Sequence, residues 1–413
     1  MSRPLPVSPL AVALPALPPM AGVRLGAAEA GIRYRGRADL VMAELAPGST
    51  VAGVFTRNRC PGAPIEWCRS VLKGGVARGV VVNAGNANVF TGRAGTAAVD
   101  ATAAAAAKLL KCPAGQVFLA STGVIGEALP YDRLTAALPA LHRSLTPDGW
   151  EQAARGIMTT DTFPKAVTTT TLIGGVEVRI TGIAKGSGMI APDMATMLCF
   201  VFTDAAIPAI PLQAMLERRV ETSFNRTTVD SDTSTSDTVL LFATGQAKHP
   251  PVPVDNGGGP MLREFRAALG ELLLELALQV VRDGEGAQKL IRIDVTGAVS
   301  VKSAKIIGMA VANSPLVKTA IAGEDANWGR IVMAVGKAGQ PAERDRLSVG
   351  VGGVWMARDG ALVADYDETP VVAHMKGHEV QIAIDLGLGR GKATVWTCDL
   401  THGYIDINGS YRS

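Results

Sequence analysis

The sequence predicts a layered α/β protein with a smaller α/β domain at its C-terminal end. Its 413 residues are too many for one compact core, so two or three folded units are expected. Between residues 52 and 120, short apolar runs alternate with turn residues and an Ala-rich helix, which is typical of mixed α/β layers. From about Leu290 onward strand patterns dominate, and we therefore place a domain boundary near residue 288.

The first third of the chain contains two strands that run into turns. Residues 80–82 predict a buried strand, and the Asn- and Gly-rich residues 83–88 predict a turn into the helix 96–110. A second strand, 116–120, leads into the small residues 121–126, a turn where the backbone could approach a ligand closely.

The remaining elements follow from hydrophobic periodicity and from turn residues. We expect helices at 132–145, 149–158, 211–224 and 261–282, a loop at 254–260, and strands at 166–172, 176–183, 198–203, 291–295 and 380–384.

Composition and charge indicate a well-packed globular protein that acts on a small molecule. Hydrophobic residues make up 47% of the chain and charged residues 19%, which argues against extended disorder. The 40 basic and 37 acidic residues leave a formal net charge of +3 without a basic run or stripe. Nucleic-acid binding is therefore not expected.

The cysteines and the N-terminal residues indicate the cellular compartment of the protein. Five cysteines, an odd number spread thinly, do not suggest a disulfide framework, so a cytoplasmic location is expected. Cys60 and Cys68 lack a nearby His and are interpreted as buried small hydrophobes rather than zinc ligands. The first 22 residues contain six prolines, which would break the helix of a signal peptide. We expect an extended surface arm there and no membrane span.

Metal and nucleotide chemistry find no support in the motifs. The five His residues and the carboxylates show neither metal-ligand spacing nor a paired-acid pattern, so no metal and no cofactor are predicted. His374 and His378 lie four residues apart, yet Gly377 beside them indicates a surface loop. Residues 185–188 lack the residue order of a phosphate-binding loop.

Thr196 stands out through its context. A Thr that opens a strand is ordinary by itself. Here a Gly-rich turn with Lys185 and then Pro192 come first, the small Ala195 directly precedes the Thr, and a strongly apolar strand follows.

The stretch KGSGMIAPDMATML, residues 185–198, resembles the cleavage-site motif of the ornithine acetyltransferase family. These arginine-biosynthesis enzymes mature by autoproteolysis at an Ala-Thr or similar bond. The likeness runs from about residue 14 to the last residue. Ser413 stands where Thr is also common, and Asp193 where the family often has Asn. Further matching segments are 51–58, 82–88, 121–126, 158–162, 283–287, 325–330 and 407–413.

The resemblance implies an αββα-type sandwich of the ornithine acetyltransferase and aminopeptidase kind over about residues 14–288. A C-terminal α/β domain would cover 289–400, and the tail 401–413 would return to the active site. Cleavage between Ala195 and Thr196 would give an alpha chain, 1–195, and a beta chain, 196–413, with two of each in the assembly.

The implied reaction is a ping-pong acetyl transfer. Thr196 would take the acetyl group from N2-acetyl-L-ornithine and pass it to L-glutamate, with its own α-amine as the base. Some family members also accept acetyl-CoA, which leaves that donor open here. Two alternatives remain: a related N-terminal-nucleophile aminopeptidase or amidohydrolase, and a non-catalytic binding protein that kept the fold.

Residue roles follow from the same resemblance. Thr122 and Gly123 would donate to the oxyanion. Charge suggests that Lys185 holds a substrate carboxylate and Glu285 a substrate ammonium. The full set carried over to the substrate site is Thr159, Lys185, Thr196, Glu285, Asn408 and Ser413.

Overall fold

The computed structural model describes residues 6–191, 197–254 and 259–409, and its contacts divide the chain into two compact units. The larger unit comprises residues 13–225 and 232–280. The smaller unit comprises residues 1–12, 226–231 and 281–413, of which only the described residues are discussed. Within the described ranges, none of the helices has the length and apolarity needed to cross a membrane.

Two sheets form the middle of the larger unit. The first is four-stranded and runs in the order β1-β2-β4-β5, with β1 Val23–Ala28, β2 Leu40–Leu45, β4 Gly79–Asn86 and β5 Val117–Val124. The second runs in the order β3-β9-β8-β7-β6, with β3 Thr50–Phe55, β9 Thr238–Ala243, β8 Leu198–Thr203, β7 Val176–Lys185 and β6 Lys165–Ile173. The pairs β4/β5 and β8/β9 are parallel, and the other neighbours are antiparallel.

Aromatic rings contact one another in the core between the two sheets. Phe118 of β5 meets Phe242 of β9 edge to face, with ring centroids 6.1 Å apart, and Phe242 stacks on Phe202 of β8. Both geometries are favourable for aromatic pairs. Trp150 of α4 (Trp150–Gly156) packs edge-on against Phe202, and Ile65 of α1 (Ala63–Val71) also joins this core.

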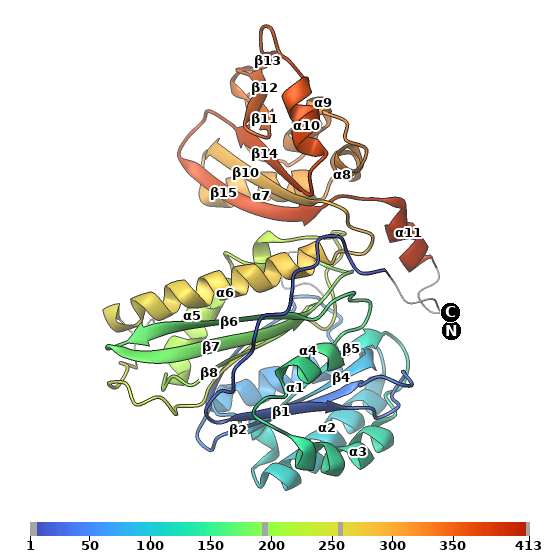
Figure 1. Cartoon of the computed structure of the whole chain (residues 1–413), viewed down its shortest axis with the longest axis vertical. Helices are drawn as coiled ribbons and strands as arrows, with labels where there is room; N and C mark the ends of the chain where they lie inside the picture. Colours follow the sequence, from blue (N-terminus) through green and yellow to red (C-terminus); the bar gives the residue numbers. More distant parts are fainter. Residues whose placement is uncertain (1–5, 192–196, 255–258, 410–413) are drawn as a thin grey trace. The chain divides into compact units, whose positions relative to one another are not determined.

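Helices cover the outer faces of both sheets. A separate core lies between the first sheet and the helices α2 (Gly92–Leu110) and α3 (Tyr131–Ser144). On the second sheet, α5 (Ala209–Val220) bonds to β3 through Gln213, and α6 (Arg263–Arg282) bonds to β6 through Gln279. The larger unit therefore has the predicted helix–sheet–sheet–helix layering, which Figure 1 shows from α2 and α3 to α6.

The smaller unit contains a six-stranded mixed sheet, and its strands and helices share a core of mainly aliphatic side chains. Its order is β13-β12-β11-β14-β10-β15, and only β10 and β14 pair in parallel. Its strands are β10 Leu290–Ala298, β11 Ser348–Val351, β12 Val354–Arg358, β13 Ala361–Leu362, β14 Glu379–Asp385 and β15 Gly391–Cys398. Its helices are α7 Val301–Ala312, α8 Pro315–Ala322, α9 Trp328–Gly336, α10 Thr369–Met375 and α11 His402–Asn408.

Several sequence expectations need correction. Residues 83–86 and 121–124 are not turns, because β4 and β5 continue as parallel partners to their ends. Helix α2 begins at Gly92, four residues earlier than predicted. Cys68 is buried as expected, whereas Cys60 is exposed. His374 belongs to α10, where its Nε2 accepts a hydrogen bond from the Gln381 amide. In the N-terminal arm, Met20 is not superficial, since it is buried in the core between the sheets.

Candidate active site

The predicted cleavage point lies in the connection between two neighbouring strands. Lys185, the last residue of β7, pairs with Leu198, the first residue of β8. The expected cut between Ala195 and Thr196 falls outside the described residues. The described ends of this connection are nevertheless held side by side in the second sheet.

Thr122 meets Lys185 across the two sheets. Thr122 lies near the end of β5 in the first sheet, and the Lys185 ammonium donates a hydrogen bond to its hydroxyl over 3.3 Å. Both residues are buried, at 2% and 3% exposure. Because an ammonium group only donates, the hydroxyl must accept this bond, and its own proton stays available for another acceptor. The arrangement suits donation to a developing oxyanion.

Gly123 is required by the sheet itself. Its φ is +131°, and a Cβ placed there would lie 2.3 Å from the carbonyl carbon of Gly85 and 2.6 Å from the amide nitrogen of Asn86. The sequence suggests that small residues here let a backbone segment approach a ligand closely. In the structure, the group that approaches Gly123 closely is the backbone of the neighbouring strand β4.

Gly123→Ala should lower the free energy of unfolding by about 2–5 kcal/mol, since backbone strain and overpacking add together. Gly126→Ala is the matched control: Gly126 has a φ of +85°, but a Cβ placed there would have no atom within 4 Å. The melting temperatures of both variants check this, provided that both proteins are measured either uncut or fully cut. Equal losses in the two variants would contradict the role of the close contact.

Lys185 belongs to a buried cluster of three charges. Asp161, between α4 and β6, hydrogen-bonds to the Lys165 ammonium over 2.7 Å and lies 3.9 Å from that of Lys185. Burial opposes ionisation of Asp161, but the charges of Lys165 and Lys185, with hydrogen bonds, hold its pKa well below the usual range. Two ammonium groups then face one carboxylate. The surplus positive charge suits a substrate carboxylate or an oxyanion.

Asp237 lies beside the residue that follows the predicted nucleophile. Its Oδ1 accepts a hydrogen bond from the Met197 amide over 3.0 Å. Burial raises the pKa of Asp237 well above its ordinary value, although hydrogen bonds from Met197 and Thr56 and the charge of Lys185 oppose this shift. Its Oδ2 has no hydrogen-bond partner within the described ranges. Asp237, which directly precedes β9, thus holds a carboxyl with a raised pKa next to the residue that precedes β8.

The other predicted substrate residues fall into two groups. In the larger unit, the Thr159 amide donates to Asp161 over 2.9 Å, which brings Thr159 to the charged cluster. In the smaller unit, the Asn408 side-chain amide donates to Glu285 over 2.6 Å. Ser413 lies outside the described residues. The structure therefore joins Thr159 with Lys185 and Thr122, and separately joins Glu285 with Asn408.

A close backbone contact holds helix α11 against the turn that carries Glu285. A Cβ on Gly286, whose φ is +76°, would lie 2.5 Å from the Tyr404 amide nitrogen. The Thr401 hydroxyl, at the start of α11, donates to the Gly286 carbonyl over 2.6 Å. These contacts explain how Asn408, at the end of α11, reaches Glu285.

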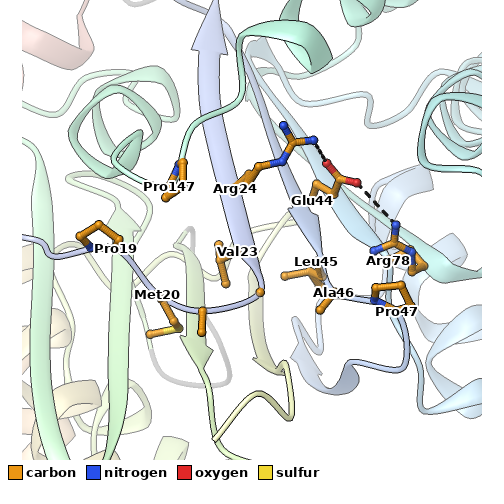
Figure 2. Close-up of a pocket in the computed structure, with 12 residues that line it drawn as sticks. Pro19, Met20, Val23, Arg24, Glu44, Leu45, Ala46, Pro47, Arg78 and Pro147 are labelled. Atoms are coloured by element: carbon orange, nitrogen blue, oxygen red, sulfur yellow. Dashed lines mark hydrogen bonds and ion pairs between the residues drawn. The ribbon is translucent and has the colours of Figure 1, made fainter.

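The pocket in Figure 2 does not include any of the predicted site residues. It has a volume of about 440 Å³ and is lined by residues 19–24, 44–47, Arg78 and Pro147. Glu44 lies on its wall and pairs with Arg24 and Arg78. Both guanidinium groups are therefore engaged by the same carboxylate.

Sequence reasoning missed part of this arrangement. Asp161 lies within a segment that matches the family, but the resemblance gives it no role, and Lys165 and Asp237 belong to no recognised motif. Only their polar character inside apolar or Thr-rich stretches could draw attention to them. Within the described ranges, no group of His, Cys, Asp or Glu residues could hold a metal ion.

Comparison with known proteins identifies the family. The ArgJ family pattern matches residues 24–413. The arginine biosynthesis bifunctional protein ArgJ of Gluconobacter oxydans is 65% identical over 413 residues, which cover 100% of this chain and 97% of that protein. The protein of the same name from Brucella suis biovar 1 is 56% identical over 98% of this chain and 99% of its own length. A crystal structure of the Bacillus halodurans protein of this name is 38% identical, covers 50% of this chain and 96% of that chain, and gives a TM-score of 0.48. The chain belongs to the ArgJ family.

Proposed function

We propose that this chain is an acetyltransferase of arginine biosynthesis that cuts itself between Ala195 and Thr196. It then transfers an acetyl group from N2-acetyl-L-ornithine to L-glutamate through acetyl-Thr196. Family membership and the names of the two similar proteins support the place in arginine biosynthesis. The contact between Lys185 and Thr122 is the observation that supports the chemistry, because Lys185 ends the strand that precedes the predicted cut in sequence and its ammonium polarises the Thr122 hydroxyl.

Self-cleavage generates the catalytic base. The Thr196 hydroxyl attacks the Ala195 carbonyl, and the C–N bond breaks as the acyl group moves to oxygen. The nitrogen takes up the proton that the hydroxyl loses and becomes a new α-amine. Water then hydrolyses the ester and leaves two chains. A hydroxyl is a weak nucleophile without a nearby base, and the freed amine can serve as that base.

Turnover repeats the attack on a substrate. Thr196 adds to the acetyl carbonyl of acetylornithine, and ornithine leaves with the proton taken from the hydroxyl. The α-amine of glutamate then attacks acetyl-Thr196 and restores the hydroxyl. Each step passes through a tetrahedral oxyanion, which Thr122 would stabilise.

Product analysis tests the proposal. Purified protein is incubated with acetylornithine and glutamate, and separately with acetyl-CoA and glutamate. N-acetylglutamate from the first mixture is the expected result, and its formation from the second would add the second donor. Free acetate without N-acetylglutamate would instead indicate the hydrolase alternative.

Glu285→Gln should raise the KM for acetylornithine and glutamate about 10- to 100-fold. A charge-assisted hydrogen bond to a substrate ammonium contributes about 1.5–3 kcal/mol, and the neutral amide loses most of it. Self-cleavage should stay intact. Steady-state kinetics check this, with Glu379→Gln as the control because that side chain is 72% exposed. Unchanged kinetics with both substrates would remove Glu285 from the site.

A further inference from the structure

Asp161 is a buried carboxylate whose two oxygens have different partners. Oδ1 accepts hydrogen bonds from the Lys165 ammonium, over 2.7 Å, and from the Gly186 amide, over 2.6 Å. Oδ2 accepts from the Thr159 amide over 2.9 Å and lies 3.9 Å from the Lys185 ammonium. Because the Asp161 and Lys165 side chains are 0% exposed, water does not screen these charges.

The two lysines share Asp161 but differ in their other contacts. Lys185 donates to the Thr122 hydroxyl, whereas Lys165 donates to the Phe163 carbonyl and lies over the Phe163 ring. A buried ammonium requires a negative partner to keep its charge. Asp161 is such a partner for both lysines, so Lys165 competes with Lys185 for its charge.

Further titratable groups face this cluster from neighbouring elements. Asp237 interacts electrostatically with Lys185 from the start of β9. Tyr34 interacts with Asp161, and Arg33 and Arg37 lie near the Tyr34 hydroxyl. Burial raises the pKa of Tyr34 above its ordinary value, so Tyr34 stays neutral over the working pH range.

We propose that Asp161 is a positioning residue for the acetyl transfer: its Oδ2 holds the Lys185 ammonium against the Thr122 hydroxyl, and Lys165 limits how strongly it does so. The inference rests on the proposed function and assigns a role to a residue that acts through Lys185. It predicts that replacing Asp161 and replacing Lys165 change the pKa of Lys185 in opposite directions, and this difference provides the test.

Two substitutions should move the titration of Lys185 in opposite directions. Asp161→Asn keeps the size of the side chain and removes the negative charge, so the pKa of Lys185 should fall by about 1 unit or more. Lys165→Met removes the competing positive charge, so the pKa of Lys185 should rise. NMR of protein labelled with ¹⁵N-lysine follows this titration, and the Lys185→Met spectrum identifies the signal.

Kinetics provide the functional readout. In Asp161→Asn the kcat for acetyl transfer should fall about 10- to 100-fold through misplacement of Lys185, and the basic limb of the pH–rate profile should move to lower pH. In Lys165→Met that limb should move to higher pH. Tyr34→Phe, the control, should leave the limb and the Lys185 titration in place.

The outcomes separate the inference from the proposed function. Titration without substrate reports on Asp161 even if the protein uses other substrates, whereas absence of N-acetylglutamate counts against the proposed function alone. Shifts in the same direction in both variants, or no shift in either, would overturn the role of Asp161. If Asp161→Asn fails to fold, Lys165→Met decides: an upward shift supports the role, and no shift or a downward shift refutes it.

Discussion

Replacing Thr196 with alanine should leave one uncut chain of 413 residues that transfers no acetyl group. Alanine lacks the hydroxyl that attacks Ala195, so neither the ester nor the new α-amine can form. Denaturing gels should show one band for the variant and two bands, residues 1–195 and 196–413, for the natural protein. Acetyl transfer is measured on the same samples.

Thr196→Ser is the matched control for this experiment. Serine keeps both the hydroxyl and, after cleavage, the α-amine, so cutting and activity should persist at reduced rates. Either a cut Thr196→Ala protein or a fully active natural protein that remains a single chain would refute the nucleophile assignment.

Thr122→Ala should slow self-cleavage and acetyl transfer together, each by about 10²–10³-fold. Both reactions develop an oxyanion, and the variant loses the hydroxyl that Lys185 polarises over 3.3 Å. Thr122→Ser should recover most of the loss, because it restores the hydroxyl. The cleavage half-time, the single-turnover acetylation rate and the melting temperature are measured on the same preparations.

A purely structural role for Thr122 has a different signature. In that case Thr122→Ala would cost up to ~2 kcal/mol of stability without a selective rate defect. Thr122→Val provides the control, since it fills nearly the same space without a hydroxyl. Normal cleavage and acetylation rates in Thr122→Ala would eliminate the oxyanion role.

Elements with a clear hydrophobic pattern are predicted well from the sequence. Strand β8 has the bounds expected from its apolar run, 198–203, and helix α3 differs from its predicted range by one residue at each end. The ends of β4 and β5 resemble turns in the sequence because their polar and small residues carry no strand pattern. The parallel pairing of the two strands, a tertiary contact, keeps these residues extended.

The site is predictable only in part. Thr122 and Lys185 come from the family resemblance, and the structure brings them into contact. The cluster around Asp161 depends on the pairing of β6 with β7, where Lys165 lies opposite Ala184, next to Lys185. Such a meeting of charges depends on strand register, which a single sequence does not reveal.

The strand order of the second sheet determines what the proposed cleavage leaves behind. β8 and β9 follow the cut in sequence, yet they lie between β3 and β7, which precede it. The two chains therefore contribute strands to the same sheet, with β9 and β8 of one chain between β3 and β7 of the other. Separating the chains would break the backbone hydrogen bonds between β3 and β9 and between β7 and β8. Losing one peptide bond turns refolding from a unimolecular event into an association that depends on concentration. The strand order thus favours a fixed sequence of events, in which the chain folds first and is cut afterwards.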